Sequence, residues 1–427
     1  MQATVEPTGA LGRKMTIQVP AEKIDTEVEK RLRDLSRRVR LDGFRPGKVP
    51  LRVVRQRFGR QVLHEVASEL MQESYAEALQ EHDLKPAGMA EFSVDSVEFH
   101  KDLEFVAEFE VFPEVQPAAM DGLEIRRPRV EITEEDVDRV IERLREQRKR
   151  WVEVDRPARP GDRVTFDLEA TVDGESFEGG SGKDIELELG GGRWVPGFDE
   201  RLEGARAGEH RSFDLEFPED HRNRDIAGRT VHFEVDLKKV EEPQLPEIDE
   251  AFAREFGVEE GGVEELRRQV RSNMQRELEE KIRSDLKAQV MDALLERNPV
   301  EVPSSLVEQE IKTLREQTMQ MLGVQDPEQF PDERFEEQAR RRVALGLIIG
   351  AIVRERELTP DPERVAREID RLAESYEEPE LLKEYYQRNA EARREVEGKV
   401  LEDMLVDAVL EEAEVRDEHK DFQSYMG

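Results

Sequence analysis

The chain has 427 residues, too many for one ordinary hydrophobic core, so two to three domains are expected. Charged residues make up 39% of it, its net charge is −35, and the lack of cysteine excludes disulfides, thiolate metal sites and cysteine nucleophiles. Residues 1–17 lack the apolar core of a signal peptide, and the longest apolar run, residues 343–353, is too short for a bilayer of roughly 30 Å, so a soluble, cytoplasmic protein without membrane contact is expected.

Residues 1–112 carry the pattern of an α+β domain. Residues 15–19 predict a short strand, and two helical patterns follow on either side of a loop near residue 45. Alternating apolar positions return in residues 92–97 and 103–111, which predicts a strand pair that closes the domain. The helical positions are Ile24, Val28, Leu32, Leu35 and Val39 before the loop, and Val54, Phe58, Val62, Val66 and Leu70 after it.

The loop between these helices reads Gly43-Phe44-Arg45-Pro46-Gly47-Lys48-Val49-Pro50. Its glycines permit tight backbone geometry, and its prolines interrupt helix continuation. Phe44 lies between cations and has few apolar neighbours along the chain, which indicates an aromatic side chain presented at a loop tip. A lone loop phenylalanine more often packs back onto its own domain, so the loop by itself leaves both interpretations open.

Positive charge gathers around this loop, although the chain as a whole is acidic. Residues 30–60 contain twelve lysines and arginines, opposed only by Asp34 and Asp42, so the segment carries a charge of +10. Such a patch would orient the molecule towards a polyanion such as RNA. The ordinary alternative is a solvated helix face.

Beyond residue 112, the pattern changes twice. Residues 113–149 predict a linker with one helix, capped by Thr133 with Asp136 in its first turn. From residue 150 to residue 242 the apolar period becomes two, with glycine-rich turns between short segments. This predicts a small twisted antiparallel sheet, with one short helix at residues 198–202 packed against it.

Residues 243–427 return to the helical period and keep it almost to the end. The tail after Val415 is polar and is expected to fray. Met274, Met291, Met319 and Met321 suit an adaptable apolar surface, although for each one alone a place in a helix core is the simpler interpretation. The predicted helices span residues 263–297, 304–322, 332–357, 362–376, 379–387 and 392–412, with prolines between several of them.

The loop resembles the ribosome-docking signature of the trigger factor family of bacterial chaperones, which reads Gly-Phe-Arg-any-Gly-Lys-any-Pro. Every fixed position of that signature is present here. The resemblance implies that Gly43, Phe44, Arg45, Pro46, Gly47 and Lys48 bind the ribosome near its exit tunnel, through ribosomal protein and ribosomal RNA.

Residues 150–242 resemble the FK506-binding class of prolyl isomerase as it occurs in trigger factor. The resemblance is carried by residues 172–178, by residues 190–198 and by Gly204 with Gly208-Glu209. It implies an isomerase site formed by Phe177, Trp194, Val195, Phe198, His221 and Phe233. On composition alone these aromatics would fill a small core. Leu168 stands where the family has an aromatic residue and His221 where it has a tyrosine, so weakened isomerase activity is expected.

Residues 245–274 resemble the start of the trigger factor body. The resemblance therefore implies a multidomain α+β protein with an α+β ribosome-binding domain (1–112), a linker (113–149), a small antiparallel β FK506-binding-like domain (150–242) and an elongated all-α chaperone domain (243–427). Nascent polypeptides are the implied clients. A monomer on the ribosome and a weak homodimer when free are implied as well.

No cofactor and no metal are expected, since the seven histidines show no paired metal spacing and no nucleotide-binding motif occurs. Two alternatives remain open. The protein could be primarily a soluble prolyl isomerase without ribosome contact, or an RNA-binding scaffold that uses the basic patch. A strongly acidic composition is also compatible with a high-salt cytoplasm.

Overall fold

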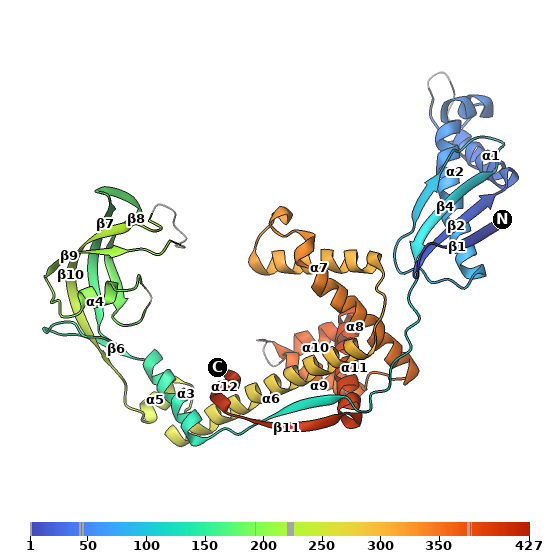
Figure 1. Cartoon of the computed structure of the whole chain (residues 1–427). Coiled ribbons are helices and arrows are strands. Elements are labelled where there is room, and N and C mark those ends of the chain that lie inside the picture. The colour runs from blue at the N-terminus through green and yellow to red at the C-terminus, as the bar shows by residue number, and fades with distance from the viewer. Residues whose placement is uncertain are drawn as a thin grey trace. The chain divides into compact units, whose positions relative to one another are not determined.

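The computed structural model describes residues 2–41, 44, 47–192, 194–219, 226–373, 376 and 378–427 (Figure 1). The chain forms two compact units, of which one contains residues 1–127 and 283–417 and the other residues 128–282 and 418–427. The multidomain α+β fold class is confirmed. The four consecutive segments expected from the sequence are a different division of the chain and stay a prediction.

The N-terminal part is an antiparallel sheet covered by two helices. The strands β1 (Gln2–Pro7), β2 (Gly12–Val19), β4 (Leu103–Glu110) and β3 (Glu91–Val94) lie side by side in that order. Apolar residues at every second position of β2 and β4 face the buried sides of α1 (Ala21–Arg38) and α2 (Leu51–Glu81). Both predicted helices are confirmed. β1 escaped prediction because it is a short, largely exposed edge strand that depends on pairing with β2.

A two-stranded ribbon and a capped helix follow. Thr133 and Asp136 form a reciprocal capping box at the start of α3 (Glu134–Gln147), as predicted. The strand β5 (Glu124–Val130) pairs with β11 (Glu414–Lys420), and the short helix α12 (Phe422–Met426) buries Phe422. The prediction of a fraying tail is therefore wrong. The tail's charged sequence gives no sign of a strand, but β5 pairs with β11 and orders it.

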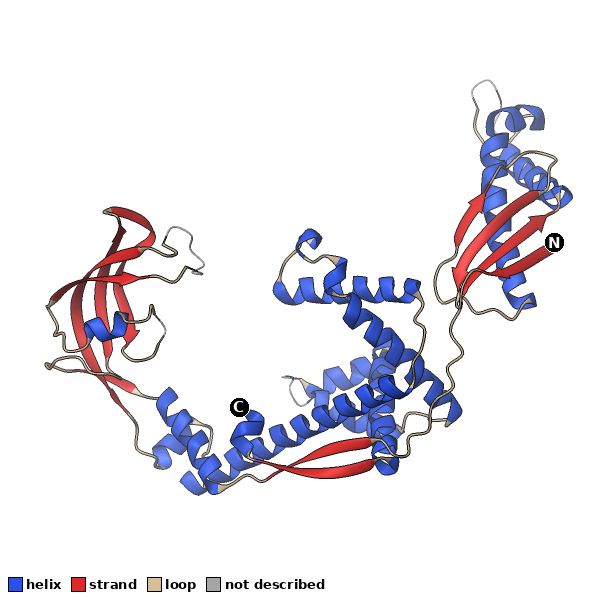
Figure 2. Ribbon diagram, viewed as in Figure 1, coloured by secondary structure: helices blue, strands red, loops and turns tan. Residues whose placement is uncertain are grey.

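Residues 150–244 form a five-stranded antiparallel sheet (Figure 2). Its order is β6 (Arg150–Glu153), β10 (Thr230–Gln244), β7 (Arg163–Val172) and β8 (Glu175–Glu188), and β9 (His210–Glu216) also pairs with β10. Asp173 and Gly174 close the β7–β8 hairpin with φ values of 52° and 84°, a turn that glycine and aspartate tolerate. The short helix α4 (Phe198–Leu202) packs onto the sheet, which confirms the predicted architecture.

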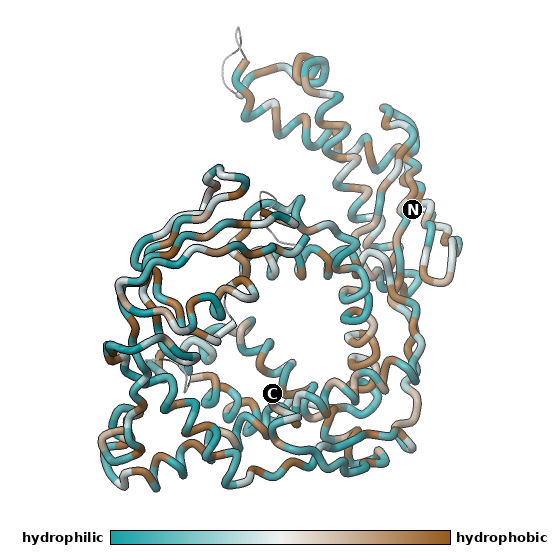
Figure 3. Tube along the Cα trace, turned by 60° about the vertical axis from the view of Figure 1, so that its left-hand side comes forward, coloured by the Kyte–Doolittle hydropathy of each residue, from teal (hydrophilic) through white to brown (hydrophobic). Residues whose placement is uncertain are grey.

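The remaining chain is helical. Hydrophobic and hydrophilic residues are mixed along its helices (Figure 3), and no helix among the described residues is long and apolar enough to cross a membrane. The predicted helix at 332–357 begins later, after a 3₁₀ turn at Asp332–Arg334, and the one at 362–376 ends at Ala373. The helices are α5 (Glu250–Glu255), α6 (Gly262–Arg297), α7 (Ser304–Leu322), α8 (Glu336–Glu355), α9 (Pro362–Ala373), α10 (Pro379–Arg388) and α11 (Ala390–Glu412).

A shielded carboxylate joins α9 to α11. The Glu368 side chain is 12% exposed and lies 2.8 Å from Arg371 and 2.7 Å from Lys399. A hydrogen bond from Arg371, supported by one from Lys399, lowers the pKa of Glu368 to about 2 against the opposing effect of burial. Because this pKa is lower in the folded chain than in the unfolded chain, ionised Glu368 stabilises the fold above its ordinary pKa of 4.5. That stabilisation is lost as the pH falls towards 2.

Glu368→Gln is accordingly expected to lower the free energy of unfolding at neutral pH by about 2 kcal/mol, after allowance for screening by solvent around its partly exposed partners. Denaturant unfolding followed by circular dichroism would measure the difference, which should shrink as the pH falls below 4.5. Glu395→Gln, an exposed position on α11, serves as the control and should change little. A Glu368→Gln deficit that stays constant down to acid pH would contradict the assignment.

Candidate functional sites

The loop between α1 and α2 has a fixed base and an exposed tip. Val49 is 5% exposed and packs into the N-terminal core, and Pro50 is the N-cap of α2. Gly47 has φ +76°, and a Cβ there would lie 3.3 Å from the carbonyl oxygen of Arg37, so glycine is favoured at this position. Phe44 is 39% exposed, and its backbone N–H donates to the Leu41 carbonyl at 3.1 Å.

The tip therefore presents an aromatic side chain to solvent, with the exposed Lys48 following it. Of the residues predicted to bind the ribosome, Phe44, Gly47 and Lys48 lie in the described chain. Gly43, Arg45 and Pro46 lie outside the described residues.

Acidic residues that lie outside residues 30–60 in the sequence pair with part of the basic patch formed by that segment. Arg31 pairs with Glu69 at 2.6 Å, while Arg33 and Arg55 share Glu29 at 2.9 and 3.0 Å. The charge of +10 counted for residues 30–60 therefore overstates the local charge, because folding places Glu29 and Glu69 beside these cations. In the described part of the chain, Arg38, Arg40 and Lys48 make no ion pair and remain available to a polyanion.

The residues predicted for the isomerase site come together in one apolar cluster. The Phe198 ring lies at its centre, with ring centroids 4.6 Å from Trp194 and 5.3 Å from Phe233. Phe198 and Phe233 are 0% and 4% exposed, whereas Phe177, Trp194 and Val195 are half-buried and pack against the same cluster. The cluster thus has a buried floor and an accessible rim. His221 lies outside the described residues.

Other aromatic residues of this cluster were not predicted as site residues. Phe166 lies 5.8 Å and Phe213 5.4 Å from Phe198 between ring centroids, and Phe217 stacks on Phe233 at 6.3 Å. These residues lie at apolar positions of the alternating strand pattern, and that pattern could have identified them from the sequence. Leu168 is 5% exposed in the same core, opposite Val235 on β10, so the wall of the cluster has an aliphatic side chain at this position.

Asp199 holds the approach to the rim in place. Its carboxylate accepts a hydrogen bond from the backbone N–H of Gly190 at 2.9 Å, which ties the Gly190-Gly191-Gly192 turn to α4. Trp194 and Val195 lie between these two points. This hydrogen bond therefore joins the two flanks of the segment that carries Trp194 and Val195.

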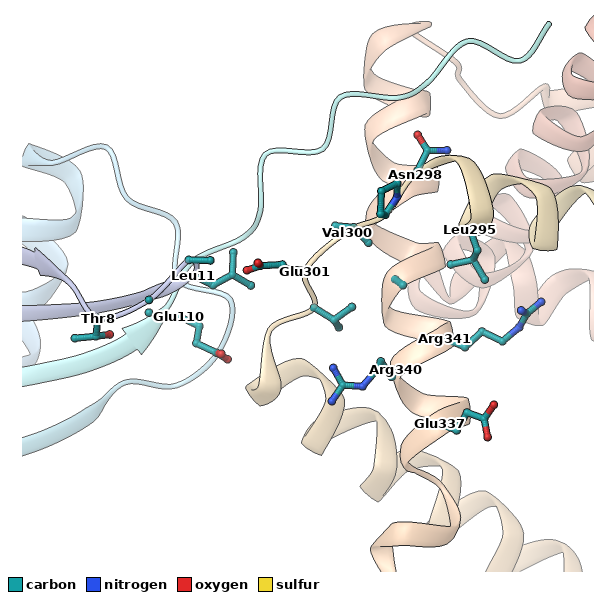
Figure 4. Close-up of a pocket in the computed structure, with 16 residues that line it drawn as sticks. Thr8, Leu11, Glu110, Leu295, Asn298, Val300, Glu301, Glu337, Arg340 and Arg341 are labelled. Carbon is teal, nitrogen blue, oxygen red and sulfur yellow. The ribbon is translucent and has the colours of Figure 1, made fainter. Parts of the chain in front are cut away.

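A cavity of ≈ 930 Å³ opens within the unit that contains residues 1–127 and 283–417 (Figure 4). The β1–β2 turn lines one side, and the segment between α6 and α7 together with α8 lines the other. Its apolar lining residues include Leu11, Leu295, Val300, Val302 and Ala344.

Other apolar side chains are exposed on the helical part. Among the described residues of this part, the most exposed are Met321 at 79%, Leu381 at 61%, Tyr376 at 59%, Leu322 at 57% and Tyr385 at 51%. Of the four methionines considered as adaptable surface, Met274 and Met291 are buried at 5% and 7%, so they belong to helix cores. Met319 is half-buried, and Met321 is the one that is openly exposed.

Comparison with known proteins identifies three family matches along the chain. Residues 1–144 match the family described as bacterial trigger factor protein, residues 154–238 match FKBP-type peptidyl-prolyl cis-trans isomerase, and residues 262–411 match the bacterial trigger factor C-terminus. These matches follow the order expected from the sequence.

Full-length relatives agree with these matches. Trigger factor of Thioalkalivibrio sulfidiphilus is 46% identical over 427 residues, which covers 100% of this chain and 98% of the relative. Trigger factor of Alkalilimnicola ehrlichii is 47% identical over 429 residues, covering 100% of this chain and 95% of the relative. A solved structure described under "Promiscuous Substrate Recognition in Folding and Assembly Activities of the Trigger Factor Chaperone" has 20% identity and a TM-score of 0.50, covers 96% of this chain and 100% of its own, and shares the fold.

Proposed function

Because the chain belongs to the trigger factor family and is a ribosome-associated chaperone with an FKBP-type prolyl isomerase domain, we propose how its parts divide the work. Residues 1–112 dock at the ribosome, residues 150–242 isomerise prolyl bonds, and residues 243–427 hold clients, with residues 113–149 as the linker. The alternatives of a free isomerase or an RNA scaffold are not favoured, because relatives named trigger factor match the whole chain.

The exposed Phe44 on its fixed loop base is the observation that carries the docking assignment. An aromatic side chain inserted into an apolar pocket of a ribosomal protein would supply specificity. Lys48, Arg38 and Arg40 make no ion pair among the described residues, so they could contact phosphates of ribosomal RNA near the exit site. Ribosome co-sedimentation of loop variants tests this assignment.

The isomerase mechanism follows from the accessible rim of the aromatic cluster. Rotation about a prolyl bond faces a barrier of roughly 18–20 kcal/mol, because amide resonance keeps the bond planar. Phe177, Trp194 and Val195 would enclose the proline and strip water from the preceding carbonyl, which disfavours the polar planar form relative to the twisted one. His221 would donate a hydrogen bond to a substrate carbonyl. The buried Phe198 and Phe233 would support this wall from beneath.

Restoring the two family residues is expected to raise catalysis. Leu168→Phe adds an aromatic edge to the cluster, and His221→Tyr adds a phenolic donor, so the double variant should show a several-fold higher kcat/KM. Protease-coupled turnover of a short proline peptide measures this, and thermal unfolding checks that the buried position 168 accepts the larger ring. An unchanged kcat/KM in a folded double variant would show that these departures do not limit the enzyme.

Client holding uses exposed apolar side chains and requires no ATP. The exposed Met321, Leu322, Leu381 and Tyr385 offer adaptable contacts to unfolded nascent chains of many sequences. Release would follow from modest affinity and competition with folding. We place this activity in the cytoplasm, with a monomer on the ribosome and a weak homodimer when free.

A further inference from the structure

The segment between α6 and α7, residues 299–303, lies outside the helices and strands of the fold but has the sequence and burial pattern of an extended strand. It reads Pro-Val-Glu-Val-Pro, and each proline favours extended backbone in the residue before it. Val300 and Val302 are half-buried while Glu301 is exposed, which is the alternation of a strand. Within the described chain, the backbone groups of Val300, Glu301 and Val302 make no hydrogen bond.

Both ends of the 299–303 segment are pinned. On the α6 side, the buried Asn298 accepts a hydrogen bond from the Ala118 backbone N–H at 2.7 Å and donates to the Leu294 carbonyl at 2.7 Å. On the α7 side, the Glu110 carboxylate accepts hydrogen bonds from the Ser304 hydroxyl at 3.0 Å and from the Ser305 N–H and hydroxyl at 3.0 and 3.1 Å.

These contacts hold both flanks of the segment in place without a ligand. Burial raises the pKa of Glu110, but the hydrogen bonds from Ser305 and Ser304 outweigh it and lower the pKa overall. The carboxylate is therefore ionised at neutral pH and caps α7, whose own N-cap, Pro303, has no side-chain cap. A segment that is held at both flanks loses less conformational entropy when a ligand binds.

The cavity of ≈ 930 Å³ lies along this segment (Figure 4). Leu11 contributes to it from the β1–β2 turn, and Leu295 and Ala344 contribute from α6 and α8. Arg341 is paired with Asp292, and Glu110 is occupied by the two serines. The cavity thus offers a ligand apolar side chains and unpaired backbone groups beside the charged lining residues Glu301, Glu337 and Arg340.

We propose that an extended segment of an unfolded client binds in this cavity as an added strand along Val300–Val302. Its backbone hydrogen-bonds with the 299–303 segment, and its alternate side chains pack on Val300, Val302 and Leu11. The inference rests on the proposed client-holding function and adds a defined subsite to it. Recognition through the backbone is independent of client sequence, which suits a chaperone, and apolar contacts favour β-branched side chains.

A pair of peptides tests the hydrogen bonding directly. The probe is a fluorescein-labelled peptide of alternating valine and threonine with terminal lysines, and its partner is the same peptide N-methylated at alternate residues. Fluorescence anisotropy with the full chain should show about tenfold tighter binding of the unmethylated peptide, as expected for the loss of two hydrogen bonds. Glu301→Pro, which deletes one backbone donor in the segment, should reduce that preference, whereas Glu301→Ala keeps the donor and should retain it.

Photo-crosslinking supplies a readout that does not depend on a proline substitution. With p-benzoylphenylalanine in place of Leu11, the labelled probe should crosslink, and the unlabelled peptide should compete better than its N-methylated partner. Equal affinities for the two peptides or absence of this crosslink would overturn the proposal. An aggregation assay separates this proposal from the proposed function. If the wild-type chain did not suppress aggregation of a denatured client, client holding itself would be contradicted. If the chain suppressed aggregation but bound the two peptides equally, only the added-strand subsite would be contradicted.

Discussion

Replacing Phe44, Arg45 and Lys48 by alanine is expected to abolish co-sedimentation with ribosomes while the N-terminal domain stays folded. Phe44 is 39% exposed and lies outside the N-terminal apolar core, and Lys48 is exposed as well, so their removal should leave the fold intact. The buried Val49 and the left-handed Gly47, which hold the loop base, are unchanged. Loss of an aromatic anchor together with two cations should weaken binding by about 100-fold or more.

Phe112→Ala is the matched control, because Phe112 is 45% exposed in the same unit but lies outside the loop. It should bind ribosomes like the wild type. Arg38→Ala with Arg40→Ala should lower affinity moderately and flatten its salt dependence, because these cations would contact phosphates without specifying the site. Full ribosome binding by the triple loop variant would contradict the docking role. Equal binding of the wild type to ribosomes and to arbitrary RNA would revive the scaffold interpretation.

Phe198→Ala is expected to unfold the isomerase domain, with a loss of about 3–5 kcal/mol. The ring is completely buried and contacts Trp194, Phe213 and Phe233, so its removal leaves a large cavity in a small core. Scanning calorimetry and limited proteolysis would detect the unfolded domain. A Phe198→Ala domain that melts at the wild-type temperature would contradict the central place of this ring.

Trp194→Ala separates catalysis from stability. Trp194 is half-buried on the rim, so its loss should cost only about 1–2 kcal/mol of stability. The folded variant should nevertheless lose most of its catalysis of proline-limited refolding, because the wall that encloses the proline would be open. Ribosome binding is the internal control and should not change. Refolding catalysed at the wild-type rate would remove Trp194 from the isomerase site.

Local chemistry explains which features could be predicted. The capping box of Thr133 and Asp136 and the Asp173-Gly174 hairpin depend on residues a few positions apart, so they were readable from the chain. The aromatic site residues were predicted from a resemblance, but the division into a buried Phe198 and a half-buried Trp194 depends on how α4 packs onto the sheet. No local pattern determines that division.

The amino-acid sequence by itself determined most of the helices and strands, because periodicity, capping and turn chemistry act over short distances. It placed Phe44 in a loop between two helices, but the exposure of that side chain came from the tertiary structure. The tertiary structure decided which segments that are distant in the sequence contact one another. It paired Arg31 with Glu69 and so reduced the basic patch, and it ordered the charged tail by placing β11 beside β5. It also pinned residues 299–303 between Asn298 and Glu110, since contacts between remote residues arise only when the chain folds.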